Sequence, residues 1–441
     1  MLSKKRLTLY NEPTMRFNGR SLEKRQITLR LLIVGVVAGI GTYFLYGSHA
    51  ATPQTASNEA ENGTLHNQAV IGSDAAASGG SYVAFGTPAV ANLTPLLGAL
   101  GPTDTNANLA AAGFRSVVIA TSWNAFEPAQ GSFSSSATSD IQNQINAAKA
   151  AGLSPSLDIG IQYPPSWIFN VGGGTRFVDQ YGDVADSSAG AGNAVANAVT
   201  NTAVRTEVGK YLTYLGSHLT GLDSVRLGGL GYNELRYPAG TAGSQPNAFW
   251  FYDSSSQASL PASVQGWKPG TGTVAQATTF LNAYNSAIVG YGVWLIQTGE
   301  TAFPNTTKLE LLLPDWGQRP GEAATAEGKL LASSPNQISE GLDWTDLLSQ
   351  LGGDSRVVAY STWADATNGT TNNPAPGGYI HSILPNGMLA GGESTGNGNT
   401  TTAGMNLMFQ NAKAWHWYVA NWYFNSQSQT LQQIVAAYNN S

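Results

Sequence analysis

The chain of 441 residues contains no cysteine, so it has neither a disulfide framework nor a thiolate metal site. Charged side chains are also scarce, at 11% of the residues. Glycine and small polar residues are abundant instead, and this balance favours an extracellular or wall-facing protein over a cytoplasmic one. The hydrophobic share of 42% is large enough to bury a sizeable core, which excludes a disordered or fibrous chain.

Basic residues are rare outside the N-terminus. Eight of the 21 Lys and Arg lie in the first 50 residues, together with only two of the 27 Asp and Glu. The remaining chain is therefore strongly acidic and lacks the clustered cations that phosphate binding requires. We expect no nucleic acid partner.

Motifs for metals and cofactors are missing as well. The five histidines show no HExxH or comparable ligand spacing, and neither a GxxxxGK nor a GxGxxG phosphate loop occurs. Asp179, Asp183 and Asp186 could gather a calcium ion, but they lack the EF-hand spacing, and a solvated acidic loop is the simpler interpretation. The sequence predicts no metal and no cofactor.

The first 50 residues have the pattern of an export signal. Residues 31–46 carry no charge, cations precede them, and Ser48-His49-Ala50 follows as a small-x-small site. The apolar run is at the short end for a spanning helix, so cleavage near Ala50 and retention as a membrane anchor both stay open. In either case we expect the chain beyond residue 50 to be exported, as a secreted or a cell-surface protein.

From about residue 87 onward, strand patterns alternate with helical patterns, which is typical of a parallel sheet covered by helices. Eight strands in this length predict a (β/α)8 barrel with long loops, because a doubly wound sheet needs fewer strands and usually a phosphate loop. The predicted strands are 84–93, 115–121, 156–161, 225–231, 308–313, 356–361, 388–391 and 418–422, and helices include 139–151, 205–219, 275–298 and 344–351.

Aromatic residues follow most of these strands. Barrel enzymes place their sites at the carboxyl ends of the strands, and large aromatic faces gathered there suit the flat apolar faces of sugar rings. We therefore predict a carbohydrate partner. The predicted sugar platforms are Trp123, Tyr163, Trp167, Trp316, Trp363 and Trp422.

Two glutamates stand at strand ends on opposite sides of the predicted barrel. Glu234 follows the fourth strand and Glu393 follows the seventh, and Asn233 offers an amide for a sugar hydroxyl. Glycoside hydrolysis needs two carboxyl groups flanking the scissile bond, so Glu234 and Glu393 are the candidate catalytic pair. Among the other acidic residues, Glu300 and Glu340 rank lower as the second carboxylate, Glu127 reads as structural, and Asp315 and Asp365 at strand ends could bond substrate hydroxyls.

These motifs resemble the retaining glycoside hydrolases of clan A, most nearly the β-galactosidase family 42 and its neighbours. The resemblance covers about residues 100–425 and implies that Glu234 is the acid/base and Glu393 the nucleophile. The matching residues are Gly113, Trp123, Glu127-Pro128, Gly131, Pro164-Pro165, Trp167, Asn233-Glu234 and Glu393.

The stretch around Glu234 also resembles another family of barrel enzymes. Residues 229–238 are similar to the proton-donor segment of the inverting β-amylases, which act on α-1,4-glucan. The segment around Glu393 does not resemble the β-amylase base, and Asn233 replaces a Gly. Inversion stays open as an alternative, and so does a non-catalytic sugar-binding protein on a barrel scaffold.

Residues 59–86 resemble the opening of carbohydrate-binding modules of families 6 and 35. The stretch holds too few strands to close a β-sandwich, so a linker or a strand packed on the next domain is the simpler interpretation. The predicted organisation is a basic N-terminus with a signal or anchor at 1–50, a linker with a truncated module-like segment at 51–86, and a catalytic barrel at 87–441.

One further motif points to a different enzyme class. Residues 392–396 match the GxSxG nucleophile elbow of serine hydrolases. No Asp or Glu follows Glu393, so His416 lacks the carboxylate that a catalytic triad requires. The sequence therefore favours the two-carboxylate hypothesis.

Overall fold

The computed structural model describes most of the chain from residue 93 to the C-terminus. The described residues are 93–185, 194–239, 244, 247–306, 308–314, 317–319, 321–334, 341–367, 375–395, 401–424 and 429–441, and, as backbone only, 69–73 and 81–85. The predicted export signal and Trp316, Asp315, Glu340 and Asp186 lie outside these residues. No helix within the described ranges is long and apolar enough to cross a membrane.

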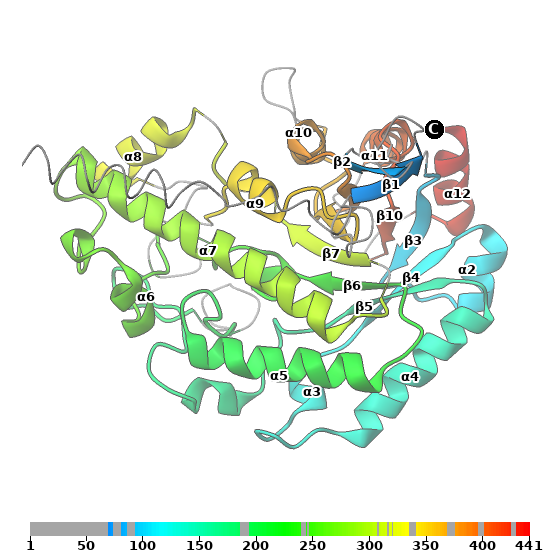
Figure 1. Ribbon diagram of the computed structural model, residues 1–441, viewed down its shortest axis with the longest axis horizontal. Helices are drawn as coiled ribbons and strands as arrows, with labels where there is room; N and C mark the ends of the chain where they lie inside the picture. The colour runs from blue at the N-terminus through cyan, green and yellow to red at the C-terminus, as the bar shows by residue number, and fades with distance from the viewer. Residues whose placement is uncertain are drawn as a thin grey trace, which may run out of the picture. The chain divides into compact units, whose positions relative to one another are not determined.

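Eight parallel strands close into a barrel, which confirms the predicted (β/α)8 fold (Figure 1). Closure comes from the pairing of the last strand with the first, where Val419 aligns with Leu96. The strands in order are β3 (Leu96–Leu100), β4 (Ser116–Ala120), β5 (Ser154–Asp158), β6 (Ser224–Leu227), β7 (Lys308–Leu313), β8 (Val357–Ser361), β9 (Leu389–Glu393) and β10 (Val419–Tyr423).

The first predicted strand, 84–93, is wrong. The first barrel strand is β3, and residues 81–85 instead form β2 (Ser81–Phe85), which pairs with β1 (Ala69–Ser73) in a separate two-stranded sheet. By internal contacts the chain divides into residues 1–64 with 71–83 and residues 65–70 with 84–441. The boundary at residue 50 and the module-like nature of 51–86 stay predictions.

Helices follow the strands and cover the outside of the barrel. Figure 1 shows α5 and α7 side by side along one flank. Side-chain caps set several starts: Thr273 and Gln276 form a capping box on α7, as Thr430 and Gln433 do on α12. The helices are α2 (Asn106–Ala112), α3 (Trp123–Phe126), α4 (Ser135–Ala150), α5 (Thr202–His218), α6 (Ser254–Ser259), α7 (Val274–Ala302), α8 (Ala323–Leu331), α9 (Trp344–Leu351), α10 (Pro376–Ile383), α11 (Thr402–Ala414) and α12 (Leu431–Asn440).

Alternation along each strand divides its residues between the barrel interior and the helices. On β7, Leu309 packs toward Gly299 of α7, whereas Leu312 joins an interior cluster with Val358 and Val419. The interior is not uniformly apolar, because Arg226 of β6 and Glu310 of β7 are buried within it. A buried charge needs a partner, so Arg226 and Glu310 indicate a cluster of polar side chains inside the barrel.

Candidate active site

The loop after β6 delivers Glu234 through a tight backbone turn. Tyr232 and Asn233 both adopt left-handed conformations, with φ of 59° and 62°. The turn folds back so closely that a Cβ on Gly228 would collide with the carbonyl oxygen of Asn233. The Asn233 side-chain oxygen accepts a hydrogen bond from the Gly229 amide at 3.0 Å. Left-handed non-glycine residues are costly, and they concentrate where a functional side chain must be aimed.

Glu234 has one charged neighbour in its own loop and one polar neighbour after β8. Arg236 lies 3.3 Å from its Oε2, and the Thr362 side chain, whose hydroxyl donates to the Leu313 carbonyl at 3.1 Å, also interacts with the carboxyl group. Burial raises the pKa of Glu234; Arg236 and Thr362 oppose this rise, and the negative charge of Glu393 adds to it. The carboxyl group is therefore biased toward its protonated form.

Glu393 ends β9 and is anchored from the barrel interior. Its Oε2 lies 2.7 Å from Nη2 of Arg226, and it accepts a hydrogen bond of 2.9 Å from the Tyr360 hydroxyl. Burial raises the pKa of Glu393, while the Arg226 guanidinium and the Tyr360 hydrogen bond lower it. The two donors are the features that favour an ionised carboxylate in this buried position.

Glu234 and Glu393 are 159 positions apart in the chain, yet the charge of Glu393 raises the pKa of Glu234. Thr362, whose side chain lowers the pKa of Glu234, directly follows β8, and its neighbour Ser361 pairs with Gly392 of β9. The next residue of β9 is Glu393, whose carbonyl oxygen accepts a hydrogen bond from the Ala364 amide. The ends of β8 and β9 therefore bring both carboxyl groups to the same side of the barrel.

Among the predicted platforms that lie within the described residues, Tyr163 is the best exposed. Its side chain is 41% exposed, and burial of the remainder raises its pKa, with further contributions from Asp158 and Tyr423. These neighbours place Tyr163 at the strand ends of β5 and β10. Trp167 is half-buried and donates to the Glu127 carbonyl at 2.9 Å, and Trp363, next to Thr362, is also half-buried.

Two predicted platforms are wrong. Trp123 is 0% exposed, stacks on Tyr211 at 5.5 Å and donates to the Glu127 carboxylate at 2.8 Å. Trp422 is equally buried and packs against Phe409 of α11. On β10 the side chain of Asn421 enters the barrel and bonds Tyr360, so alternation turns Trp422 outward under the helices.

Several other acidic residues have structural roles. Glu127 accepts from Trp123 and from the Gly131 amide, as expected of a structural residue. Both oxygens of Asp365 take hydrogen bonds from Thr395, so Asp365 fastens the loop after β9 and leaves little for a substrate hydroxyl. Asp179 accepts from the amides of Tyr181 and Asp183, which identifies a turn.

Glu300 and the serine elbow do not belong to the site. Glu300, near the end of α7, hydrogen-bonds Asp354 just before β8, at the amino ends of the strands. Ser394 is fully buried and accepts from the Tyr423 amide at 3.0 Å, so it cannot act as an exposed nucleophile. His416 contacts the Leu93 carbonyl, also at the amino ends.

Sequence reasoning missed four residues that the structure places with the pair. Arg226 and Tyr360 contact Glu393, Asp158 lies 3.9 Å from Arg226, and Tyr232 is 63% exposed beside Asn233. Arg226 could have been found, because an arginine inside an otherwise apolar predicted strand is unusual. For Tyr360 no local signal exists, because tyrosine is common in buried strands.

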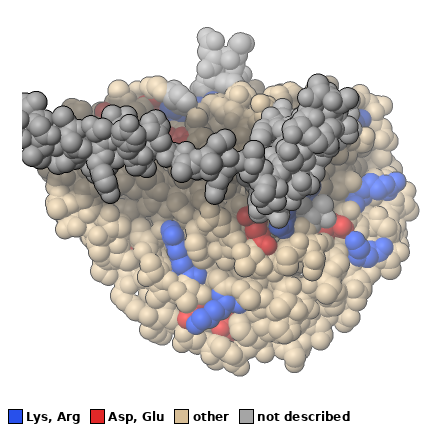
Figure 2. All heavy atoms as spheres, in the orientation of Figure 1, with Lys and Arg blue, Asp and Glu red and all other residues tan. Residues whose placement is uncertain are grey.

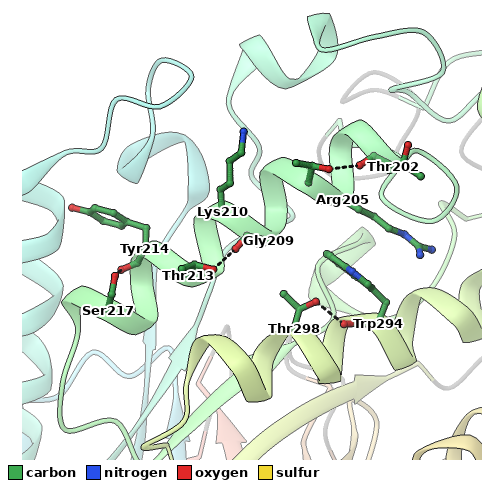
Figure 3. A pocket seen from close by; sticks show the side chains of 10 residues that line it. Thr202, Arg205, Gly209, Lys210, Thr213, Tyr214, Ser217, Trp294 and Thr298 are labelled. Atoms are coloured by element: carbon green, nitrogen blue, oxygen red, sulfur yellow. Dashed lines mark hydrogen bonds between the residues drawn. The ribbon is translucent and has the colours of Figure 1, made fainter.

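A groove of about 840 Å³ lies elsewhere, between α5 and α7 on the helical layer (Figure 3). Thr206, Thr213 and Thr298 line it, and their hydroxyls donate to carbonyls of their own helices. Figure 2 shows charged side chains thinly spread over the face in view. The groove contains neither carboxyl group of the pair, and we assign it no part in the site.

Comparison with known proteins supports the fold. No protein-family model and no curated protein sequence matches the chain. A β-galactosidase from the psychrophilic Marinomonas ef1 is similar in structure, with a TM-score of 0.51 and 11% identity over 78% of this chain and 59% of that one. For a β-galactosidase from the haloarchaeon Halorubrum lacusprofundi the TM-score is 0.48, with 15% identity over 76% and 52% of the two chains. The chain thus spans less than two thirds of either enzyme, and the likeness to the Marinomonas enzyme, at 11% identity, shows the barrel fold alone.

Proposed function

We propose that the barrel is a glycoside hydrolase that cleaves β-linked oligosaccharides or polysaccharides with retention of configuration. The observation that carries the proposal is the pairing of two carboxyl groups whose donors differ in distance and number. Glu393 has a guanidinium at 2.7 Å and a phenol hydroxyl at 2.9 Å, whereas the nearest guanidinium to Glu234 lies at 3.3 Å and the charge of Glu393 raises the pKa of Glu234. The closer donors favour Glu393 as the anion, and its charge favours Glu234 as the acid.

In this mechanism Glu393 attacks the anomeric carbon and Glu234 protonates the departing oxygen. The negative charge of Glu393 helps to keep Glu234 protonated in the free enzyme. Once Glu393 forms the glycosyl ester its charge is gone, so the pKa of Glu234 falls. Glu234 then takes a proton from the attacking water, and the ester is hydrolysed.

Substrate binding would use the groups around the pair. The Asn233 side-chain nitrogen is buried and has no hydrogen-bond partner among the described residues, so it is available to a sugar hydroxyl. Tyr163 and Tyr232 present exposed rings, and the half-buried Trp167 and Trp363 are further candidates. Trp316 stays a predicted platform, and export through residues 1–50 stays a proposal that N-terminal sequencing of the secreted and membrane fractions would test.

The test is a substrate panel with matched variants. The panel contains aryl β-galactosides, β-glucosides and β-mannosides, plant β-glycans and starch. We expect β-glycoside cleavage that falls by about 10²–10⁴-fold in Glu234→Gln and by about 10⁴-fold or more in Glu393→Gln. Glu207→Gln, which removes a carboxylate on α5, serves as the control and should keep full activity. Binding without cleavage would leave a sugar-binding scaffold, and full activity of Glu393→Gln would remove it from the mechanism.

Stereochemistry separates retention from the β-amylase alternative. Proton NMR of the first product gives its anomeric configuration, and the β-anomer is expected from a β-glycoside. Azide added to Glu393→Ala should restore turnover and give the α-glycosyl azide, because azide takes the space of the lost carboxylate. With Glu234→Ala the product should be the β-azide, formed from the glycosyl-enzyme. An inverted first product, or cleavage of starch alone, would favour the inverting hypothesis.

A further inference from the structure

The guanidinium of Arg226 faces a different carboxyl group with each of its three nitrogens. Nη2 lies 2.7 Å from Glu393, Nη1 lies 3.7 Å from Glu310, and Nε lies 3.9 Å from Asp158. The carboxyl groups come from three strands, β9, β7 and β5. Only the contact with Glu393 has the length of a hydrogen bond, and the Arg226 side chain is 2% exposed. One cation is therefore shared among three acids.

Glu310 is the member of this group that has no place in the reaction. It is 1% exposed on the interior face of β7, paired in register with Arg226 on one side and Val358 on the other. Val358 pairs in turn with Leu389, four residues before Glu393 on β9. Glu310 thus lies below the catalytic pair, where a substrate does not reach.

The contacts of Glu310 are incomplete. Its Oε1 accepts a hydrogen bond of 3.2 Å from Ser156, and the Ser224 hydroxyl also lowers its pKa, while Oε2, which faces Arg226, has no hydrogen bond of good geometry among the described residues. A buried carboxyl group with an unsatisfied oxygen is costly. Burial raises the pKa of Glu310, and Arg226 opposes that rise. A leucine would fill this position at a lower cost in folding free energy. The carboxyl group therefore has a role that leucine cannot fill, and Arg226 is its charged neighbour.

Arg226 ties Glu310 to the nucleophile. A guanidinium devoted to Glu393 would hold it as a stable, weakly basic carboxylate, and weaker bases are poorer nucleophiles. A second carboxylate on Nη1 draws part of that charge away and also fixes the plane of the guanidinium, so that Nη2 stays aimed at Glu393.

We propose that Glu310 is a positioning residue that acts on Glu393 through Arg226, aligning the guanidinium and limiting how much of its charge stabilises the nucleophile. The proposal rests on the proposed role of Glu393. The titratable and charged groups that face Glu393 are Arg226, Tyr360, Asp158 and Glu234. Those that face Glu310 are Arg226, Glu393, Tyr360 and Tyr418, together with the hydroxyls of Ser156 and Ser224.

The direct test is a titration of the Glu393 carboxyl carbon by NMR in protein labelled with ¹³C at the glutamate carboxyl, assigned with Glu393→Gln. In Glu310→Gln we expect the midpoint of Glu393 to fall by about one pH unit, because a nearby negative charge is lost and Arg226 is freed. Glu207→Gln removes the same charge from α5 and should leave the midpoint in place. A Glu393 midpoint that stays or rises in Glu310→Gln overturns the proposal.

The kinetic test uses the pH profile of kcat/KM on an aryl β-glycoside. In Glu310→Gln its acid limb should move to lower pH together with the NMR midpoint, and in Glu207→Gln it should keep its pH. A merely structural role of Glu310 would not shift the acid limb. Should Glu310→Gln fail to fold, Glu310→Asp retracts the carboxylate by one methylene and should give a smaller shift in the same direction. If the native protein cleaves no glycoside, the proposed function fails, whereas the NMR titration still decides whether Glu310 acts on Glu393.

Discussion

Charged side chains have different hydrogen-bond partners at the two ends of the barrel. At the amino ends, Arg356 donates to the carbonyls of Phe303 and Thr306 at 2.8 and 3.1 Å, and Lys308 donates to the Ser355 carbonyl at 2.6 Å. In the interior toward the carboxyl ends, Arg226 has one short contact, and its Nε and Nη1 lack hydrogen bonds within the described part of the chain.

This difference indicates that charges at the amino ends contribute to stability, whereas charges toward the carboxyl ends belong to the candidate site. Charges tied to backbone carbonyls at strand starts join neighbouring loops, and their short hydrogen bonds offset part of the desolvation that lowers the pKa of Lys308. Charges buried against each other with unsatisfied atoms cost stability, and such arrangements concentrate at functional sites. The left-handed residues Tyr232 and Asn233 add backbone strain at the same end.

The comparison is tested most severely by removing one arginine from each end. Arg226→Met leaves three carboxyl groups in the interior without their cation, so we expect a loss of about 3–5 kcal/mol in the free energy of unfolding. Arg356→Met loses hydrogen bonds to two carbonyls and should cost about 1–3 kcal/mol. Urea denaturation at pH 7 measures both, and equal losses would show that the two arginines contribute alike to stability.

A smaller change at the mouth is Tyr360→Phe, which removes the hydrogen bond to Glu393. We expect kcat/KM to fall by about 10- to 100-fold, since a hydrogen bond to a charged group contributes about 1.5–3 kcal/mol. The lost donor also raises the pKa of Glu393, so the acid limb of the profile should move to higher pH. Tyr438→Phe removes a phenol bound to the Pro95 carbonyl near the start of β3, and its kinetics should match the native protein. A similar loss in both variants would point to a general packing effect.

Smaller effects are expected from replacing aromatic side chains, and they should differ between the exposed Tyr163 and the buried Trp422. Tyr163→Ala should raise KM by about 3- to 10-fold through loss of a stacking face, with stability nearly unchanged. Trp422→Phe should lower the free energy of unfolding by about 1–3 kcal/mol and leave KM alone, because its ring lies under α11. The reverse pattern would restore Trp422 as a sugar platform.

The smallest effect concerns pH at the amino ends. Burial and the neighbouring Asp354 raise the pKa of Glu300 from 4.5 to about 7. A carboxyl group with a raised pKa stabilises the fold fully below its unfolded value, and this contribution is lost as pH rises through about 7. Glu300→Gln should therefore reduce the fall in Tm between pH 5 and pH 8, by on the order of 1 °C. An identical fall in Tm for the native and variant proteins would show that Glu300 titrates normally.

Local pattern was sufficient for much of the fold. The predicted strand 308–313 coincides with β7 and the predicted helix 344–351 with α9, because an apolar run and an amphipathic turn after Asp343 define them without distant contacts. The first strand was misplaced since 84–93 and 96–100 are both apolar. Only pairing with β10 and β4 distinguishes the latter as the barrel strand.

The site was predictable in part. Glu234 and Glu393 could be named because each follows a strand, and strand ends share one face in any parallel barrel. Trp422 could not be excluded, since a shift of one residue along β10 exchanges the interior for the helical side. The link from Glu234 to Thr362 depends on a loop conformation that no short-range pattern encodes.

The sequence by itself determined the order of strands and helices, the barrel they make and the positions of two acids at strand ends, because these follow from hydrophobic periodicity over a few residues. The tertiary structure alone decided which aromatic rings reach solvent and that Arg226 meets Glu393, Glu310 and Asp158. Barrel closure brings together side chains from distant strands, and the balance of burial against charge is settled only in that shared interior.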